Sequence, residues 1–582
     1  MKSKITKNEG QAALGSVETF DDQSGQEKLI EANKKVVFPQ NSVDSDRESQ
    51  SKVALFITKL NAYKVAISGF LVSLLVIAII VIISLVGSKS VKEPSRYGTY
   101  VAAQTGCGRI EGLMEDSAFT FRGIPYARPP VEDLRFRHAQ PLDDVKYCWN
   151  GTFLAHNSSD VCLQVLSNGT ITGKEDCLTL DVVTPYVRYD NPLPVIVLIG
   201  ADSLMGGSPS KLRPSARYAR SRDVVFVRPN FRMGALGFLG LEILSESDRS
   251  RTSGNYGLSD ILAALKWVEL NIEHFGGNKN AVTIFGHRAG ATLVTALTTI
   301  PGANKYFIRA WAASGGAIYP KKEIKKSQKE NHSFLDSIQC EDVNCLRTVD
   351  ATKLVAAVED TWRKPQPDLP FVDEVPENRH EWLILDGRIL KTYPHEVWSA
   401  NVDRPLNLIV GTTAHSGSSK KLLMKHTVWT KEMIKQHIME SFLAQSPLLE
   451  EVLKMYPLTY QGLSKMISDI RIICPLFALS TEMSKVPFYV VTQTRLEHDL
   501  ADIDSDVDAI LGRYEPRTPE QRRYFSAVQG LFYHYVWNGK MEDNLIGEKV
   551  LIVDQDVLPN NTYLHCNYWI KKNIVPRYAA LD

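Results

Sequence analysis

A five-residue stretch with two glycines carries the most specific chemical signal in this sequence. It reads GHRAG from Gly286 to Gly290 and directly follows the apolar run Val282–Phe285. Glycines at this spacing permit a strained strand-to-helix turn, and a serine at its centre would be exposed as a nucleophile. The central residue here is Arg288, whose guanidinium stays protonated and has no lone pair that could attack a carbonyl. The sequence therefore predicts the turn without its nucleophile.

The elements that must position this turn include short apolar runs, each of which predicts a buried strand. These runs are Val195–Ile199, Val224–Val227, Val282–Phe285 and Leu406–Val410. Unbroken apolar runs are typical of strands that helices cover on both faces. Gly257–Phe275 lies between two of the runs and has apolar residues at helical spacing. This alternation predicts an α/β fold with a central, mostly parallel sheet flanked by helices.

Three segments carry a family resemblance. They are FRGIPYARPPVEDLRF (Phe121–Phe136), EDCLTLDVVTP (Glu175–Pro185) and GNYGLSDILAALKWVELNIEHFGGNKNAVTIFGHRAG (Gly254–Gly290). In this order they resemble the cholinesterase-type carboxylesterase family, and the resemblance extends from about Ser95 to the C-terminus. It implies an α/β-hydrolase fold for residues 88–582. A fold does not determine an activity, so function must be inferred from the site.

The resemblance also locates the other members of the catalytic triad. The family's acid lies in a segment similar to V-G-x-x-x-x-E-G-S, and the matching VGTTAHSGS stretch has Ser416 at that position. The family's histidine lies in a segment similar to H-G-x-E-x-x-x-x-F-G, and the matching IDSDVDAILG stretch has Ile503 there. The neighbouring alternatives are Asp502, Asp504 and the more distant His498. We expect none of them to supply the base.

The segment that would stabilise a developing negative charge is changed as well. The family has three consecutive glycines whose backbone amides form an oxyanion hole, and this chain has Ala201, Asp202 and Ser203 there. Loss of the triad alone typically removes about six orders of magnitude in turnover. One hypothesis for Arg288 is that it pairs with Asp202, because a lone buried guanidinium would cost several kcal/mol. The alternative is that Arg288 points into solvent.

The eight cysteines all lie C-terminal to residue 87, from Cys107 to Cys566. The resemblance implies three disulfides, Cys162–Cys177, Cys340–Cys345 and Cys474–Cys566, and Cys107–Cys148 remains by elimination. No C-x-x-C pair is present, which disfavours a zinc site. Asp504, Asp506, Asp508 and Glu515 have the spacing of a calcium-binding loop, but Ala509 stands where that loop requires glycine. We therefore expect an exposed acidic loop, no metal and no cofactor.

The N-terminal part of the chain predicts a membrane anchor. Residues 1–64 are mostly polar, which is typical of a disordered tail. Residues 65–87 contain no charge over 23 positions, enough for a helix to span a membrane. Five N-glycosylation sequons follow this segment, at Asn150, Asn157, Asn168, Asn331 and Asn560. With the cysteines, they predict a type II plasma-membrane protein with a cytoplasmic N-terminus and an extracellular domain at residues 88–582.

Charge and family resemblance together direct the functional hypothesis. The chain has 67 basic and 66 acidic side chains, a balance that argues against nucleic-acid binding. A subgroup of the family, which includes the neuroligins, is non-enzymatic and acts in cell adhesion. The resemblance to this subgroup implies a heterophilic adhesion receptor for a secreted or cell-surface protein with immunoglobulin domains, of the amalgam type. It also implies that the fold is able to form a homodimer.

Two alternatives stay open at this point. One is a membrane-bound esterase with a rebuilt site that uses His287 or Ser416. The other is a soluble ligand carrier that is released by cleavage within the juxtamembrane stretch Ser88–Tyr100.

Overall fold

The computed structural model describes residue 64, residues 68–81 and residues 99–580. The second range has gaps at 143, 188–189, 320–321, 364–365, 367, 376–377, 401–406, 418–427, 446, 483–485 and 546–549. The chain forms two compact units, Met1–Ser90 and Val91–Asp582. The predicted tail lies outside the described residues apart from Lys64, and only residues 68–81 of the predicted span are described, as a helix. No helix within the described ranges has both the length and the apolar character needed to cross a membrane.

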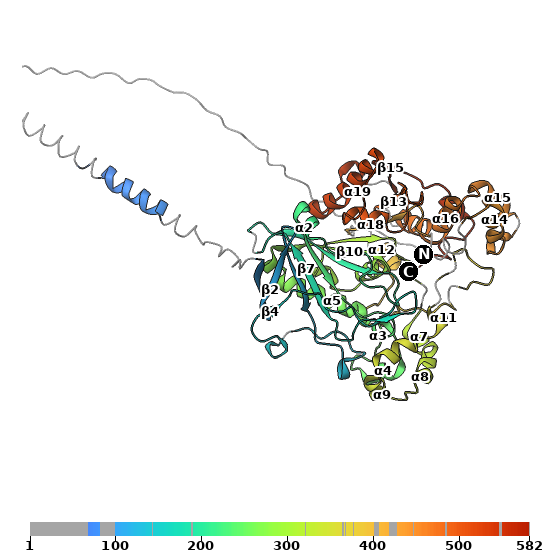
Figure 1. The fold of residues 1–582 in the computed structure, drawn as a ribbon, viewed down its shortest axis with the longest axis horizontal. Coiled ribbons are helices and arrows are strands. Elements are labelled where there is room, and N and C mark those ends of the chain that lie inside the picture. The colour runs from blue at the N-terminus through green and yellow to red at the C-terminus, as the bar shows by residue number, and fades with distance from the viewer. Residues whose placement is uncertain are drawn as a thin grey trace, which may run out of the picture. The chain divides into compact units, whose positions relative to one another are not determined.

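A large mixed sheet forms the centre of the second unit (Figure 1). Its order, within the described residues, is β1-β2-β3-β7-β9-β8-β10-β11-β12-β13-β14-β15, and β4 pairs with β2. The strands are β1 (Tyr100–Thr105), β2 (Gly108–Glu115), β3 (Ala118–Pro125), β4 (Phe153–Leu154), β7 (Thr179–Thr184), β8 (Leu193–Ala201), β9 (Val225–Pro229), β10 (Gly277–Arg288), β11 (Arg309–Ala313), β12 (Leu408–Thr413), β13 (Phe488–Val491), β14 (Val550–Val553) and β15 (Val557–Asn560). A separate two-stranded sheet pairs β5 (Gln164–Val165) with β6 (Ile171–Thr172).

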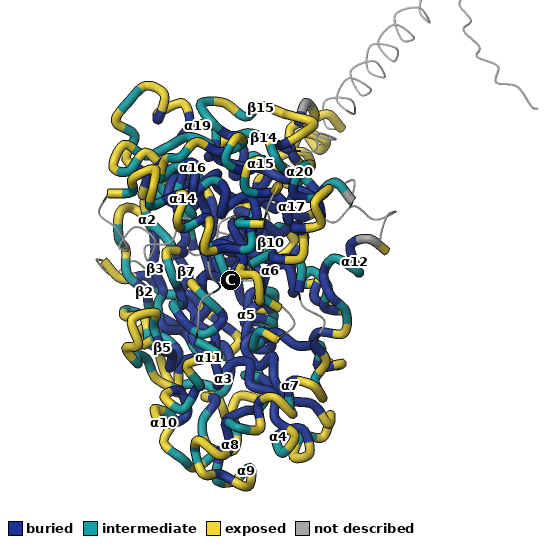
Figure 2. Tube along the Cα trace, turned by 90° about the vertical axis from the view of Figure 1, so that its right-hand side faces the viewer, coloured by how far each residue is buried: buried dark blue, intermediate teal, exposed yellow. Residues whose placement is uncertain are grey.

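In sheet order, the strands from β9 to β14 run parallel to one another. The pairs β1–β2, β2–β3, β3–β7 and β7–β9 at one end and β14–β15 at the other are antiparallel. Every residue of β8 and of β12 is buried, and Figure 2 shows this buried interior running through the domain. The four predicted strands are thus confirmed. Their continuous apolar composition fits a sheet covered on both faces.

Helices flank the sheet, as the alternating pattern predicted. They are α2 (Ala216–Arg222), α3 (Gly234–Phe238), α4 (Glu242–Ser247), α5 (Tyr256–Asn271), α6 (Ala289–Leu297), α7 (Ile324–Glu330), α8 (His332–Ile338), α9 (Val343–Thr348), α10 (Ala351–Ala356), α11 (Asp360–Arg363), α12 (Pro394–Ala400), α14 (Lys431–Met439), α15 (Leu448–Met455), α16 (Tyr460–Ser468), α17 (Cys474–Glu482), α18 (Ser505–Ile510), α19 (Pro519–Asn538) and α20 (Cys566–Lys571). The predicted helix Gly257–Phe275 corresponds to α5 and the 3₁₀ turn Ile272–Phe275 that follows it. In Figure 1, α2 and α19 lie on one side of the sheet and α5 lies on the other.

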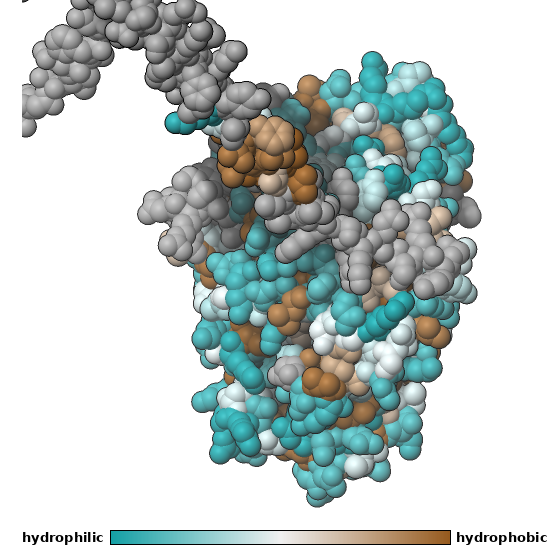
Figure 3. All heavy atoms as spheres, turned by 90° about the vertical axis from the view of Figure 1, so that its left-hand side faces the viewer, coloured by the Kyte–Doolittle hydropathy of each residue, from teal (hydrophilic) through white to brown (hydrophobic). Residues whose placement is uncertain are grey.

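The four predicted disulfides are all present and join Cys107–Cys148, Cys162–Cys177, Cys340–Cys345 and Cys474–Cys566. The last of these links residues 92 positions apart and ties α17 to α20. The surface is mainly hydrophilic in the view of Figure 3, where the hydrophobic side chains of the domain occur in small separate groups.

Four of the five sequon asparagines are exposed, namely Asn150, Asn157, Asn168 and Asn560. Asn331 is only 2% exposed. Its side-chain nitrogen donates to the carbonyl oxygen of Gly240 at 3.0 Å and to Oγ of Ser327 at 3.2 Å. A glycan on that nitrogen would occupy space that protein atoms fill. We therefore expect the sequon at Asn331 to carry no glycan.

Candidate functional site

The predicted turn lies where β10 ends and α6 begins. Arg288, the last residue of β10, has φ 53° and ψ −128°, a region that residues other than glycine rarely adopt. The flanking glycines are required sterically, because a Cβ at Gly286 would collide with the carbonyl oxygen of Gly290. A Cβ at Gly290 would likewise collide with the carbonyl oxygen of Ile199. The strained geometry of a nucleophile turn is present here with arginine at its centre.

Two carboxylates hold the Arg288 side chain, which is 27% exposed. Its Nη2 donates to Oδ1 of Asp504 at 2.9 Å, and its Nη1 lies 3.7 Å from Oδ1 of Asp202. The predicted pairing with Asp202 is therefore present, but Asp504 is the closer partner and the less exposed one. Sequence reasoning considered Asp504 as an alternative to the catalytic base and as part of a calcium-binding spacing, and missed it as an ion-pair partner.

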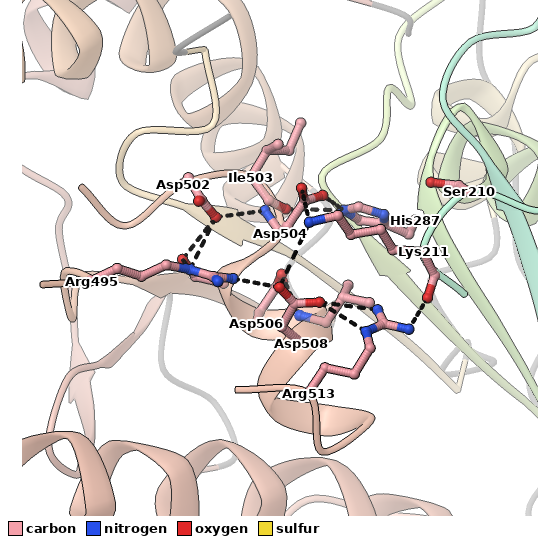
Figure 4. Close-up of polar contacts among 12 residues, drawn as sticks. Ser210, Lys211, His287, Arg495, Asp502, Ile503, Asp504, Asp506, Asp508 and Arg513 are labelled. Carbon is pink, nitrogen blue, oxygen red and sulfur yellow. Dashed lines mark hydrogen bonds and ion pairs between the residues drawn. The ribbon is translucent and has the colours of Figure 1, made fainter. Parts of the chain in front are cut away.

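Asp504 lies against two further basic side chains besides Arg288. Lys211 approaches Oδ2 to 2.8 Å, and Nε2 of His287 lies 3.6 Å from Oδ1. Figure 4 shows Asp504 between His287 and Lys211. Burial alone would raise the pKa of Asp504, but the adjacent charges of Arg288 and Lys211, together with His287, hold it well below its ordinary value. Asp504 is therefore ionised at neutral pH.

His287 immediately precedes the turn, and it is fully buried. Its Nε2 lies 2.9 Å from the carbonyl oxygen of Ile503. Burial and the neighbouring positive charge of Arg288 lower the pKa of His287 to about 4. The ring is therefore neutral at pH 7, and Nε2 donates to that carbonyl. Its Nδ1 is buried without a hydrogen-bond partner among the described residues. The imidazole therefore does not accept a proton from any hydroxyl group of the described residues.

The positions matched to the acid and the histidine are close in space to the turn. Ser416 follows β12 and is 5% exposed, and its Oγ has no hydrogen-bond partner within the described ranges. Ile503 contributes its backbone carbonyl to His287. His498 instead pairs with Asp502 at 3.0 Å. The fold thus brings the sequence-predicted positions together, but they do not form an acid–base relay.

The oxyanion-hole segment folds into a turn that uses its own amides. The amide of Asp202 donates to the carbonyl oxygen of Gly207 at 3.3 Å, and that of Ser203 donates to the carbonyl oxygen of Gly206 at 3.0 Å. Asp202 also accepts a hydrogen bond from Oγ of Ser210 at 2.6 Å. Two of the three amides that would stabilise an oxyanion are thus engaged within the turn, beside a carboxylate that would repel one.

A cleft of about 1320 Å³ lies above these residues, and Arg288, Asp202, Ser203, Ser416, Ile503 and Asp504 contribute to its lining. It is at the carboxyl ends of the parallel strands, where ligands usually bind in such sheets. The fold therefore retains the position and the space of an active site.

The prediction of an exposed acidic loop is wrong, because Asp504, Asp506 and Asp508 are all buried. The last two lie in α18. Asp508 binds Arg495 at 2.7 Å and Arg513 at 3.0 Å, as Figure 4 shows. Buried carboxylates require such partners, and the helix is incompatible with an extended calcium loop. In the part of the chain that the structure describes, no group of three His, Cys, Asp or Glu side chains is arranged to hold a metal.

Asp506 is the exception among the three carboxylates, since it has no cationic partner among the described residues. Oη of Tyr489 donates to its Oδ2 at 2.7 Å, and the amide of Val507 donates to its Oδ1 at 2.8 Å. Complete burial raises the pKa of Asp506 to about 7. A carboxyl that titrates near neutral pH therefore lies two residues from the partner of Arg288.

Comparison with known proteins agrees with this geometry. The model of the carboxylesterase family matches residues 99–544. Neurotactin from Drosophila melanogaster is 46% identical over 98% of this chain and 71% of that protein. Fumonisin B1 esterase from Sphingopyxis macrogoltabida is 33% identical over 54% of this chain and 56% of that enzyme. A solved structure of PNB esterase is similar in fold, with a TM-score of 0.63 and 24% identity over 81% of this chain and 99% of that one.

Proposed function

Because the chain belongs to the carboxylesterase family, we propose that it uses this fold as a catalytically inactive, cell-surface adhesion receptor. The observation that carries the proposal is the ion pair at the turn. Arg288 stands in the place of a nucleophile and is bound to Asp504 at 2.9 Å. A guanidinium cannot attack an acyl carbon, and its ion-pair partner cannot supply the imidazole that a serine would need.

The surroundings support the loss of the reaction independently of Arg288. The amides of Asp202 and Ser203 are engaged within their own turn, and removal of a single oxyanion-hole donor costs about 2.7–4 kcal/mol of transition-state stabilisation. Ser416 provides no carboxylate at the acid position. Each part of the machinery is therefore replaced, while the glycines that maintain the fold remain.

The proposed role follows from the similarity to Neurotactin, which extends over almost the whole chain. The non-enzymatic adhesion subgroup that the sequence resembles includes proteins of this architecture. In this proposal residues 65–87 anchor a type II protein in the plasma membrane, and residues 88–582 bind an extracellular ligand with immunoglobulin domains. The exposed sequon asparagines carry glycans on that side.

A cell-aggregation assay tests the proposal. Non-adherent cells that express the full chain are mixed with a secreted immunoglobulin-domain candidate of the amalgam type, and aggregates are expected only when the candidate is present. Aggregation that is equal without any candidate would indicate homophilic binding instead. An epitope at the N-terminus should be accessible only after permeabilisation, and one at the C-terminus should be accessible on intact cells.

The same purified chain tests the competing esterase reading. We expect no hydrolysis of p-nitrophenyl acetate above the uncatalysed rate. Turnover that disappears in His287→Ala or Ser416→Ala would contradict the proposed inactivity and identify a rebuilt site.

A further inference from the structure

An arginine-rich surface lies where α2 meets the N-terminal part of α19. Residues 211–223 and 512–523 contain nine basic and three acidic side chains, although the whole chain has a net charge of only +1. Seven of these arginines are exposed. Arg220 lies over the Tyr186 ring, and we call the other six the arginine surface: Arg213, Arg217, Arg513, Arg517, Arg522 and Arg523. These two short segments therefore carry a local excess of six positive charges.

Direct contacts join the two segments into one surface. The guanidinium of Arg513 donates to the carbonyl oxygen of Lys211. Gly512 packs so tightly on the Tyr218 ring that a Cβ would collide with it. Gln529 of α19 donates to Oη of Tyr218 at 3.1 Å, and Figure 1 shows α2 and α19 next to each other. Arginines that are about 300 positions apart in sequence therefore share one face.

Most of these guanidiniums have no acidic partner in the part of the chain that the structure describes. Arg513 pairs with Asp508 and Arg517 with Glu497, the latter at 3.8 Å. The other four arginines form no ion pair with any carboxylate of the described residues. An exposed guanidinium presents a planar fork of donors that matches carboxylate, phosphate or sulfate groups. The surface is therefore suited to a ligand with several anionic groups.

The composition of the surface favours a polysaccharide over a protein. Residues 211–223 and 512–529 are all described, and none of their large apolar side chains is exposed. Protein interfaces usually have an apolar core inside a polar rim, and this face offers no such core. The exposed sequons lie in other segments, so no predicted glycan originates here. We propose that the arginine surface binds a sulfated polysaccharide of the glycosaminoglycan class.

Heparin-agarose tests this binding with the full chain solubilised in detergent. We expect retention at physiological salt and elution at higher NaCl, because binding of a polyanion releases counterions. The triple variant R217Q/R522Q/R523Q should elute at lower salt and bind heparin roughly tenfold more weakly, about 1.4 kcal/mol. The matched control K325Q/K326Q/K329Q removes three exposed charges from α7 and should elute like the unmodified chain.

Several results would overturn the proposal. A chain that passes through the column unretained at physiological salt would contradict the proposal. So would an α7 control that loses as much heparin affinity as the arginine variant. Equal retention on hyaluronan, which has carboxylates but no sulfates, would exclude sulfate recognition. If the triple arginine variant no longer aggregates with the immunoglobulin-domain ligand but binds heparin as before, the arginine surface binds the protein ligand instead. Only the extracellular placement rests on the proposed function, so failure on heparin leaves the adhesion proposal standing.

Discussion

Arg288 and Asp504 are 216 positions apart in sequence, and their side chains meet at 2.9 Å in the place where a serine and a histidine would meet in an active hydrolase. The contact is an ion pair between a residue in a strained backbone conformation and a carboxylate whose side chain is 10% exposed. It therefore replaces a proton-transfer contact by a structural one.

Restoring the serine alone should not restore esterase activity. In Arg288→Ser the hydroxyl would face Asp504 and the backbone of Ile503, with no free imidazole to accept its proton. We expect p-nitrophenyl acetate hydrolysis to stay at the uncatalysed rate, and we expect no labelling by a fluorophosphonate probe. Labelling of the variant at residue 288 would show that the surrounding groups still activate a nucleophile.

The two carboxylates beside Arg288 should differ in their contribution to stability. Asp504→Asn removes a buried negative charge that compensates Arg288 and Lys211, and loss of hydrogen bonds to a charged group costs about 1.5–3 kcal/mol. Asp202→Asn is the matched control, because its side chain is 51% exposed and such pairs contribute about 1 kcal/mol or less. Urea unfolding of both variants at pH 7 measures the difference, and equal losses would contradict the assigned partner.

Asp506 should make stability depend on pH near neutrality. Its pKa is raised from 3.8 to about 7 in the folded protein, so between these pH values the folded state binds a proton that the unfolded state does not. The stabilisation that Asp506 contributes is therefore complete below about pH 4 and is lost as pH rises through 7. The free energy of unfolding falls by at most about 1.4 kcal/mol per pH unit over this range. Asp506→Asn lacks this titration.

The measurement for Asp506 is the free energy of unfolding of both proteins from pH 5 to pH 8. As pH rises, the free energy of unfolding of the unmodified chain should fall relative to that of Asp506→Asn. A difference that is constant across this range would mean that Asp506 is already ionised when the protein is folded.

Glycan occupancy should follow exposure rather than sequon identity. Peptides that contain Asn150, Asn157, Asn168 and Asn560 should gain the mass shift left by enzymatic deglycosylation, because these side chains are exposed. The Asn331 peptide should not, because its side-chain nitrogen is buried and donates to Gly240 and Ser327. Mass spectrometry of the secretory-pathway protein decides this, and an occupied Asn331 would require a different local structure.

Local pattern determined much of the architecture. The unbroken apolar runs predicted β8, β9, β10 and β12, because a strand buried on both faces has no reason to alternate. The glycines of the turn predicted its geometry, because only residues without a Cβ fit beside Gly290 and Ile199. Arg288 itself ruled out a nucleophile by its chemistry. Three disulfides were predicted from the family resemblance and the fourth by elimination, and all four are present.

The tertiary structure alone decided which groups meet and which are buried. Asp504 became the principal partner of Arg288 because the loop after β13 converges with the end of β10 at the carboxyl edge of the sheet, a proximity that no local spacing encodes. The same packing buried Asp506 and Asp508 in a segment whose acidic composition predicted exposure, and it buried Asn331 despite its sequon. Composition and periodicity report what each segment prefers locally. Burial and ion pairing depend on distant segments, so for these residues the fold overrode the local signal.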